Sequence, residues 1–257
     1  MKHFVKPKKH LGQHFLNDVS IAEKVASMFN GDGIDLPVLE IGPGTGVLTQ
    51  YLMENFKEVR AIELDRESVA FLKDNFVPKG LKLMEGDFLD SRNDAMFFPD
   101  DLLILGNFPY NISSQIVFKV LDNIPKVKGF GGMFQKEVAE RLVAGPGSKT
   151  YGILSVFLNT YYKTSYQFTV GPELFTPPPK VQTGVIKATR IDGYELPCSR
   201  ALFFDVVKTA FNQRRKTLRN ALHKFNLQES HEFAKLRAEQ LSHHDFIKLT
   251  QFLEQIQ

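Results

Sequence analysis

The sequence predicts an α/β fold, in which a mostly parallel sheet of seven strands has helices on both faces and precedes a small all-helical C-terminal domain. Short apolar runs, typical of buried strands, alternate with segments of helical periodicity and are joined by short loops. From residue 200 to residue 257 the pattern is helical throughout. The composition changes after Ile191, so we expect domains at residues 1–191 and 192–257.

The expected elements follow one another closely along the first domain. Asp18 is a typical N-cap and should begin a helix that extends to about residue 29. After a helix at residues 151–161, strands at residues 162–170 and 181–191 should form an antiparallel pair that closes the sheet. Between them, the proline-rich residues 175–179 should form a rigid extended loop. The other strands are expected at residues 38–41, 59–65, 81–88, 102–108 and 128–135, with helices at residues 47–55, 66–76, 113–123 and 136–143. The helix at residues 113–123 should have Ser113 or Ser114 at its N-cap.

Four of these strands end in a glycine or a polar residue, namely Gly42, Glu63, Asp87 and Asn107. Right-handed crossovers place the carboxyl ends of parallel strands at one edge of a sheet. Open α/β sheets bind their ligands at this edge. The four strand ends should therefore line one cleft, and their convergence indicates a site more strongly than any single motif.

Composition limits the class of protein. The chain has 257 residues, 43% of them hydrophobic and 23 of them phenylalanine, which is ample for a packed core. Its single cysteine, Cys198, excludes an internal disulfide and fits a reducing compartment. No apolar run reaches the ~18 residues of a membrane span, and the basic N-terminus lacks the apolar region of a signal peptide. We expect a cytoplasmic monomer that does not bind membranes.

The turn after the strand at residues 102–108 presents an amide beside a phenol ring. Pro109 fixes its own φ angle and favours an extended Phe108, so the turn should be stiff. The side-chain oxygen of Asn107 and the carbonyl of Phe108 could accept the two N–H groups of an exocyclic amine. Tyr110 could stack on the base, which is worth roughly 1–3 kcal/mol. The alternative is an ordinary turn, because this tetrapeptide also occurs in plain loops.

A glycine-rich turn follows the first strand, with glycines at residues 42, 44 and 46. A dinucleotide fingerprint would need its third glycine one position later, so the spacing suits a nucleoside without a pyrophosphate, such as S-adenosylmethionine. Glu63 would then bind the ribose hydroxyls and Asp87 the adenine amine, with Leu64 and Phe88 on either side of the ring. The alternatives are strand-end carboxylates in ordinary salt bridges and a dehydrogenase.

Two segments are rich in basic residues although the formal net charge is only +3. Residues 2–10 include Lys8 and Lys9, and form either a solvated tail or an arm on a phosphate backbone. Residues 211–222 have amphipathic periodicity and almost no acidic neighbours in sequence, which favours nucleic acid over a solvated face. No Cys/His set has metal spacing, so we expect no metal. In the second segment Arg214, Arg215 and Arg219 would face outward, and Lys216 is a further basic residue expected to bind RNA.

With these motifs assembled, the chain resembles the KsgA-type small-subunit rRNA adenine dimethyltransferases over nearly its whole length. The resemblance implies a Rossmann-like S-adenosylmethionine-dependent methyltransferase fold. It also implies transfer of two methyl groups to N6 of each of two adjacent adenosines in the 3′-terminal hairpin loop of 16S rRNA, in an immature small subunit. The motifs that carry it are LGQHFL (11–16), VLEIGPGTGVLT (38–49), IELD (62–65), GDF (86–88), GNFPYNIS (106–113), QKEVAERLVAGPGSKTYGILSV (135–156), FTPPPKV (175–181) and FNQRRKTLRNAL (211–222).

The family pattern implies roles for individual residues of this chain. Two positions depart from it, because residue 14 is commonly Asn and residue 108 is usually Leu. Since only the main-chain carbonyl of Phe108 is needed, activity should survive that change. The residues implied to contact S-adenosylmethionine are His14, Leu16, Gly42, Glu63, Asp87 and Asn107, and the motifs described above add Gly44, Leu64 and Phe88. The residues implied to hold the target adenine are Asn107, Phe108 and Tyr110, with Phe175 as a candidate for stacking on the base, and the motif adds Pro109, which stiffens the turn.

Three other functions remain open from the sequence. A 23S-type rRNA adenine methyltransferase or a DNA amino-methyltransferase would share the cofactor motifs, but FTPPPKV and FNQRRKTLRNAL favour the small-subunit family. The protein could instead act mainly as an assembly factor that binds immature subunits. A dehydrogenase is the third alternative.

Overall fold

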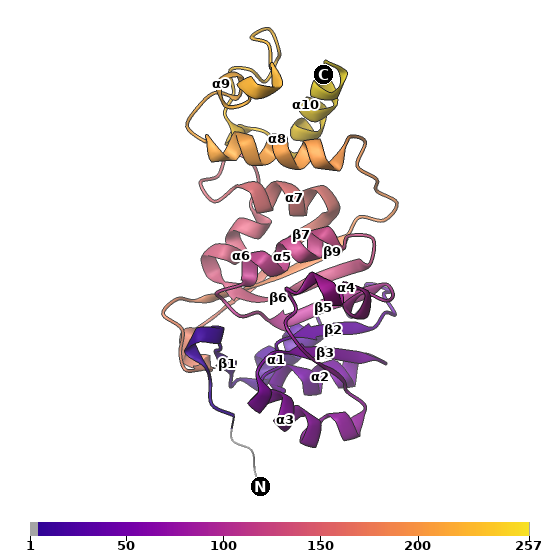
Figure 1. The fold of residues 1–257 in the computed structure, drawn as a ribbon. Coiled ribbons are helices and arrows are strands. Elements are labelled where there is room, and N and C mark those ends of the chain that lie inside the picture. Colours follow the sequence, from indigo (N-terminus) through magenta and orange to yellow (C-terminus); the bar gives the residue numbers. More distant parts are fainter. Residues whose placement is uncertain (1–4, 257) are drawn as a thin grey trace. The chain divides into compact units, whose positions relative to one another are not determined.

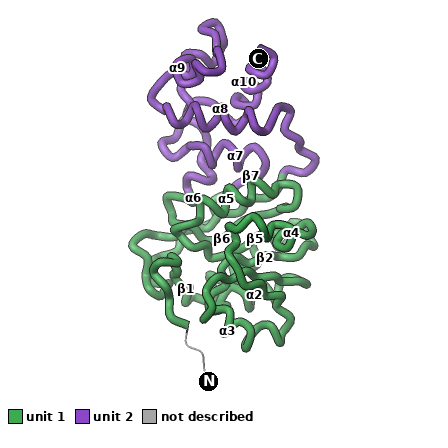
Figure 2. Tube along the Cα trace, in the orientation of Figure 1, with its two compact units in different colours: residues 1–139, 165–190 green, residues 140–164, 191–257 purple. Residues whose placement is uncertain are grey.

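The computed structural model describes residues 5–256, so Lys2 of the expected basic arm lies outside the described residues. The chain forms two compact units (Figure 2). The first contains residues 1–139 and 165–190, and the second contains residues 140–164 and 191–257. The predicted boundary at residues 191 and 192 lies next to one of these divisions. Residues 140–164, which we expected in the first domain, belong to the second unit.

The seven-stranded sheet has the order β4-β3-β2-β5-β6-β9-β7 (Figure 1). Strands β4, β3, β2, β5 and β6 are parallel to their neighbours, and β9 pairs antiparallel with β6. The predicted mostly parallel seven-stranded sheet is therefore confirmed. The strands are β2 (Val38–Ile41), β3 (Val59–Glu63), β4 (Lys82–Glu85), β5 (Leu102–Asn107), β6 (Val127–Gln135), β7 (Tyr162–Val170) and β9 (Thr183–Arg190).

Both faces of the central strands are buried. Leu103 and Leu105 of β5 belong to one apolar cluster with residues of the first three helices, whereas Leu102 and Ile104 point to the opposite face. All four side chains are fully buried, as expected for a parallel sheet covered on both sides. The helices of this part of the chain are α1 (Val19–Ala26), α2 (Val47–Asn55), α3 (Arg66–Asn75), α4 (Asp94–Phe97), α5 (Ser113–Asp122) and α6 (Lys136–Val143).

Helix starts agree with the sequence at some positions and differ at others. Asp18 caps α1 as predicted, and its carboxylate accepts from the backbone nitrogen of Ile21 at 3.1 Å. The predicted cap of α5 by Ser113 or Ser114 is wrong, because Ile112 is the N-cap. The Ser113 hydroxyl donates instead to the carbonyl of Tyr110, which stabilises the turn at the site. Short 3-10 turns complete the first unit at Lys9–Leu11, Val77–Lys79, Ser91–Asn93 and Pro172–Leu174.

A two-stranded sheet that the sequence did not predict joins the N-terminal segment to the proline-rich loop. Strand β1 (Phe15–Leu16) pairs antiparallel with β8 (Phe175–Thr176). The backbone nitrogen of Asn17 also donates to the carbonyl of Leu174 at 2.8 Å. The segment before the first helix is thereby fixed beside the loop that follows β7.

The second unit is built around α7 (Ile153–Tyr161), α8 (Arg200–Asn212) and α10 (His243–Gln255), with a short α9 (Leu218–Ala221). Helix α7 is buried on most of its surface and packs against α8 and α10. The Phe157 ring of α7 stacks on Phe204 of α8, with centroids 3.8 Å apart. This packing explains why residues 140–164 join the helical unit.

The amphipathic periodicity of residues 211–222 does not correspond to a single helix in the structure. Helix α8 ends at Asn212, and α9 begins only at Leu218 after Thr217, whose backbone is extended. Between α9 and α10 the chain forms only 3-10 turns, at His223–Phe225 and Ala238–Gln240, so the part after residue 200 is less helical than predicted.

Candidate functional site

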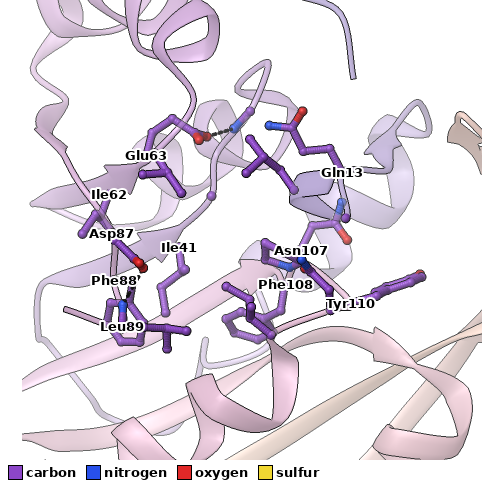
Figure 3. A pocket seen from close by; sticks show the side chains of 18 of the residues that line it. Gln13, Ile41, Ile62, Glu63, Asp87, Phe88, Leu89, Asn107, Phe108 and Tyr110 are labelled. Atoms are coloured by element: carbon purple, nitrogen blue, oxygen red, sulfur yellow. Dashed lines mark hydrogen bonds between the residues drawn. The ribbon is translucent and has the colours of Figure 1, made fainter. Parts of the chain in front are cut away.

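A cavity lies at the carboxyl ends of β2, β3, β4 and β5, where the sequence predicted the cleft (Figure 3). It encloses about 870 Å³ of space free of protein atoms, part of it open to solvent. All four predicted strand ends line it, together with the N-terminal residues Leu11 to Phe15. The predicted site residues on its wall are His14, Gly42, Gly44, Glu63, Leu64, Asp87, Phe88, Asn107, Phe108, Pro109 and Tyr110.

The glycine-rich turn after β2 requires glycine for two separate reasons. Gly42, Gly44 and Gly46 all have positive φ angles, of 67°, 57° and 76°, which other residues rarely adopt. A Cβ atom on Gly44 would also lie 2.7 Å from the ring of Phe15. The turn can therefore approach the N-terminal segment closely, and the Gly44 nitrogen donates to Glu63 Oε2 at 3.0 Å.

The Glu63 carboxylate is buried at the end of β3 and is oriented by main-chain groups. Its Oε1 accepts from the nitrogen of Asp65 at 2.8 Å, and its Oε2 accepts from Gly44. Burial raises the pKa of Glu63, and the two backbone hydrogen bonds oppose this shift. Each carboxylate oxygen has a further lone pair, so Glu63 can still accept from two hydroxyl groups in the cavity.

The end of β4 provides a second carboxylate and an aromatic wall. Asp87 is exposed, and its Oδ1 accepts from the nitrogen of Leu89 at 2.8 Å, which leaves Oδ2 for a ligand. The Phe88 ring is buried against Phe97, with centroids 5.8 Å apart, and its position is therefore fixed. Leu64 lines the same cavity and is 51% exposed, which is unusual for a leucine.

The turn after β5 presents Asn107 and Tyr110 at the cavity, and it anchors Phe108 in the core. The Asn107 Nδ2 donates to the carbonyl of His14 at 2.8 Å. The Phe108 side chain is buried and packs against Phe134, with ring centroids 4.7 Å apart. The departure from the usual family residue at this position therefore changes the packing of the core, and the main chain of Phe108 remains beside the cavity. The Tyr110 hydroxyl is hydrogen-bonded to the Thr183 hydroxyl of β9.

Two predicted site residues lie away from this cavity. Phe175 is 2% exposed, belongs to the apolar core and faces Leu16 across the β1–β8 pair, so the suggested stacking on a target base is not supported by its position. Leu16 lines a smaller adjacent cavity, which it shares with Gly42 and Asn107.

That smaller cavity is also lined by Glu40, which was not among the residues predicted from the sequence. Glu40 is 1% exposed on β2, and burial raises its pKa to about 8. Its Oε2 accepts from the hydroxyl of Thr49 at 2.6 Å. A lone acid within the apolar run VLEIG was the signal that could have identified it.

Several basic residues expected to bind RNA have acidic partners, so the expectation that the 211–222 run lacks them is wrong. Lys8 pairs with Asp65 and with Glu67 near the start of α3. Arg214 pairs with Glu239 at 3.2 Å, and Arg219 pairs with Glu229 at 2.8 Å.

Three of the basic residues expected to bind RNA differ from these paired ones, namely Lys9, Arg215 and Lys216. They are exposed and have no ion-pair partner among residues 5–256.

Between residues 5 and 256, no helix is long and apolar enough to cross a membrane. No group of three or more His, Cys, Asp or Glu side chains in this range could hold a metal ion.

The ribosomal RNA adenine dimethylase family model matches residues 5–255 of the chain. The chain belongs to this family. The predicted enzyme class, an S-adenosylmethionine-dependent rRNA adenine dimethyltransferase, is thereby confirmed, and a dehydrogenase is no longer an alternative.

Named relatives and solved structures are similar to this chain over most of its length. Ribosomal RNA small subunit methyltransferase A of Flavobacterium johnsoniae is 53% identical over 254 residues, covering 97% of each chain. The protein of that name from Phocaeicola vulgatus is 50% identical, covering 97% of this chain and 90% of the relative. A dimethyladenosine transferase from Plasmodium falciparum superimposes with a TM-score of 0.80 at 25% identity, covering 94% of this chain and 98% of that one. The 23S rRNA methyltransferase ErmE, at 22% identity and a TM-score of 0.68, shares the fold over 92% of this chain and 99% of its own.

Proposed function

We propose that this enzyme dimethylates N6 of two adjacent adenosines in the 3′-terminal hairpin loop of 16S rRNA, using S-adenosylmethionine. The substrate would be an immature small ribosomal subunit in the cytoplasm. The small-subunit relatives, similar over almost the whole length of both chains, favour this substrate over 23S rRNA.

The residues that line the cavity suit S-adenosylmethionine in their chemistry. The glycine turn leaves room for a nucleoside. A Cβ atom on Gly44 would collide with the Phe15 ring, which lines the same cavity, and the ring would have to move. Glu63 has lone pairs free for ribose hydroxyls, and Asp87 has an oxygen free for the adenine amine. Leu64 and Phe88 provide apolar contact for the ring. When bound, S-adenosylmethionine supplies a methyl group already activated on a sulfonium.

The single observation that carries the proposal is the orientation of Asn107. Its nitrogen is used by the His14 carbonyl, so its oxygen is left as an acceptor at the cavity that also contains Gly42 and Gly44. This oxygen and the Phe108 carbonyl would accept the two N–H groups of the target adenine. They would align its nitrogen with the methyl donor, and such positioning can supply up to ~7–11 kcal/mol of the barrier.

Tyr110 would offset part of the cost of removing the base from its stack, which is about a few kcal/mol. After transfer the nitrogen is acidic and loses its proton readily, so no dedicated general base is required. The strongest candidates for contacts with RNA phosphates are the exposed basic side chains of Lys9, Arg215 and Lys216. The helical part of the chain would therefore contact the ribosomal RNA, and residues of the first unit would carry out the reaction.

Methylation of immature small subunits, followed by mass mapping of the modified nucleotides, tests the proposal. We expect two dimethylated adenosines that are adjacent and lie near the 3′ end of 16S rRNA. Modification confined to 23S rRNA, or the absence of transfer by a protein that binds S-adenosylmethionine, would overturn the proposal.

A further inference from the structure

Residues 8–17, here named the strap, form one wall of the cavity and are fixed at several points. Residues Leu11 to Phe15 line the cavity. Within the strap, the Lys8 nitrogen donates to Gln13 Oε1 at 2.8 Å. Outside it, the Asn111 side chain donates to the carbonyl of His10, and β1 pairs with β8. The strap therefore contacts both the turn after β5 and the proline-rich loop.

His14 makes three contacts from the strap, with Asn107, with Tyr110 and with the proline-rich loop. Its carbonyl accepts from Asn107 Nδ2 at 2.8 Å. Its ring lies against the Tyr110 ring, with centroids 5.3 Å apart and planes inclined by 32°. Its Nδ1 lies 2.7 Å from the carbonyl oxygen of Pro177. One residue thus contacts both groups that would hold the target base and the loop beside them.

The contact with Pro177 determines which ring nitrogen of His14 carries hydrogen. A carbonyl oxygen can only accept, so Nδ1 must be the donor. Tyr110 has a second contact besides the His14 ring. Its hydroxyl is hydrogen-bonded to the hydroxyl of Thr183, a fully buried residue of β9. Tyr110 is therefore held at its hydroxyl by β9 and at its ring by the strap.

We propose that His14 is a positioning residue for the target adenine, acting through Tyr110 and the Pro177 loop. The family pattern implies instead that residue 14 contacts the cofactor. The proposal rests on the proposed function, because it assigns His14 to the base that this function requires. The two roles differ in which step should fail when the imidazole is removed.

Three substitutions separate the two features of the imidazole. His14→Phe keeps a ring beside Tyr110 but removes the Nδ1 donor. His14→Asn removes the ring but keeps a nitrogen donor bonded to Cγ, where Nδ1 is bonded in histidine. His14→Ala removes both features, and all three keep the main-chain carbonyl that orients Asn107. His10→Ala is the matched control, since its side chain is exposed and belongs to the neighbouring turn of the same segment.

The experiment compares cofactor binding with RNA methylation in the full-length protein. The Kd of S-adenosylmethionine is measured by calorimetry, and kcat and KM by methyl transfer to immature small subunits, with melting temperatures as a folding check. We expect kcat/KM to fall about fivefold in His14→Phe, through loss of one hydrogen bond. In His14→Asn, kcat/KM should fall by about two- to tenfold, because the aromatic pair with Tyr110 is lost. His14→Ala should fall furthest, while all Kd values stay within about threefold of wild type, because neither lost contact is made to the cofactor.

Nitrogen NMR of the labelled histidine provides a readout that a merely structural role would not give. We expect the proton on Nδ1 in the wild type, and its signal should shift in Tyr110→Phe, because that variant loses the bond to Thr183 that holds the ring beside His14.

Several results would overturn the proposal. A Kd for S-adenosylmethionine that rises in step with the loss of kcat/KM would place His14 at the cofactor. Wild-type kinetics in His14→Ala, or a neutral ring protonated on Nε2 alone, would remove the positioning role. A wild-type protein that transfers no methyl to RNA overturns the proposed function and this proposal with it, whereas an active wild type confines any failure to His14.

Discussion

The side-chain nitrogen of Asn107 donates to the backbone carbonyl oxygen of His14 across 2.8 Å. A reversed amide would place two acceptor oxygens against each other, so the orientation of this side chain is fixed by chemistry. Among residues 5–256, Oδ1 of Asn107 has no hydrogen-bond donor. The acceptor for an incoming amine is therefore oriented before RNA binds, by a main-chain group of the strap.

Asn107→Ala should nearly abolish methyl transfer. Loss of one preorganised polar group at a reacting centre costs about 10²–10³ in kcat, and the Kd of S-adenosylmethionine should change much less. Asn107→Asp should also be impaired, because a carboxylate oxygen would then face the His14 carbonyl. Single-turnover methylation and calorimetry on the same preparations measure both effects, and near-normal turnover in the alanine variant would eliminate the assigned role.

Glu63→Gln should weaken binding of S-adenosylmethionine by about 10- to 100-fold, since hydrogen bonds to a charged group are worth about 1.5–3 kcal/mol. The pH dependence is a second signature. Burial raises the pKa of Glu63, so at mildly acidic pH more of it is protonated than of an ordinary glutamate. Wild-type affinity should therefore fall as the pH falls through that raised pKa, and the glutamine variant should lack this component.

Calorimetric titrations at a series of pH values from mildly acidic to neutral, carried out on both proteins, provide the measurement. Glu85→Gln is the matched control, because Glu85 ends the neighbouring strand β4, is half exposed and does not line the cavity. Equal affinity in wild type and Glu63→Gln at neutral pH would show that the carboxylate does not bind the ribose.

The sequence predicted those parts of the fold and site that show a pattern within one short segment. One general rule, the right-handedness of crossovers between parallel strands, then placed these segments relative to one another. Val38 to Ile41 is an apolar run before a glycine turn, and this local pattern is sufficient to predict β2. The handedness of crossovers then places Gly42, Glu63, Asp87 and Asn107 at one edge, where the cavity lies. No long-range contact had to be known for these predictions.

The features that the sequence did not predict depend on partners distant along the chain. Strands β1 and β8 have two residues each, too few to show an alternating pattern. Arg214 pairs with Glu239, an acid 25 positions away, so a local count of charges could not detect it. The bond from His14 to Pro177 spans 163 positions and likewise has no local signal.

The double variant Arg215→Ala/Lys216→Ala should weaken RNA binding and flatten its dependence on salt. Each lost phosphate contact lowers the slope of log affinity against log salt by about 0.7–0.9, so the double variant should lose about 1.5. Arg214→Ala should act differently, because its guanidinium pairs with Glu239 and donates to the Ser148 carbonyl. We expect that variant mainly to lower the melting temperature.

Filter binding at several salt concentrations measures the slopes. Lys57→Ala is the control, since Lys57 is highly exposed and precedes β3, at the sheet edge opposite the cavity. If the double variant and the control have the same slope as wild type, Arg215 and Lys216 belong to a solvated face.

Glu40→Gln should change how stability depends on pH. Burial raises the pKa of Glu40 from 4.5 to about 8, so between these values the folded protein binds more protons at this position than the unfolded chain does. Stability from this group is fully present below pH 4.5 and is lost as pH rises towards 8. The glutamine cannot titrate but can still accept from Thr49, so the variant should lose this slope and gain stability relative to wild type as the pH rises. Urea denaturation at intervals across this range measures the difference, and parallel curves for the two proteins would mean that Glu40 does not bind the extra proton.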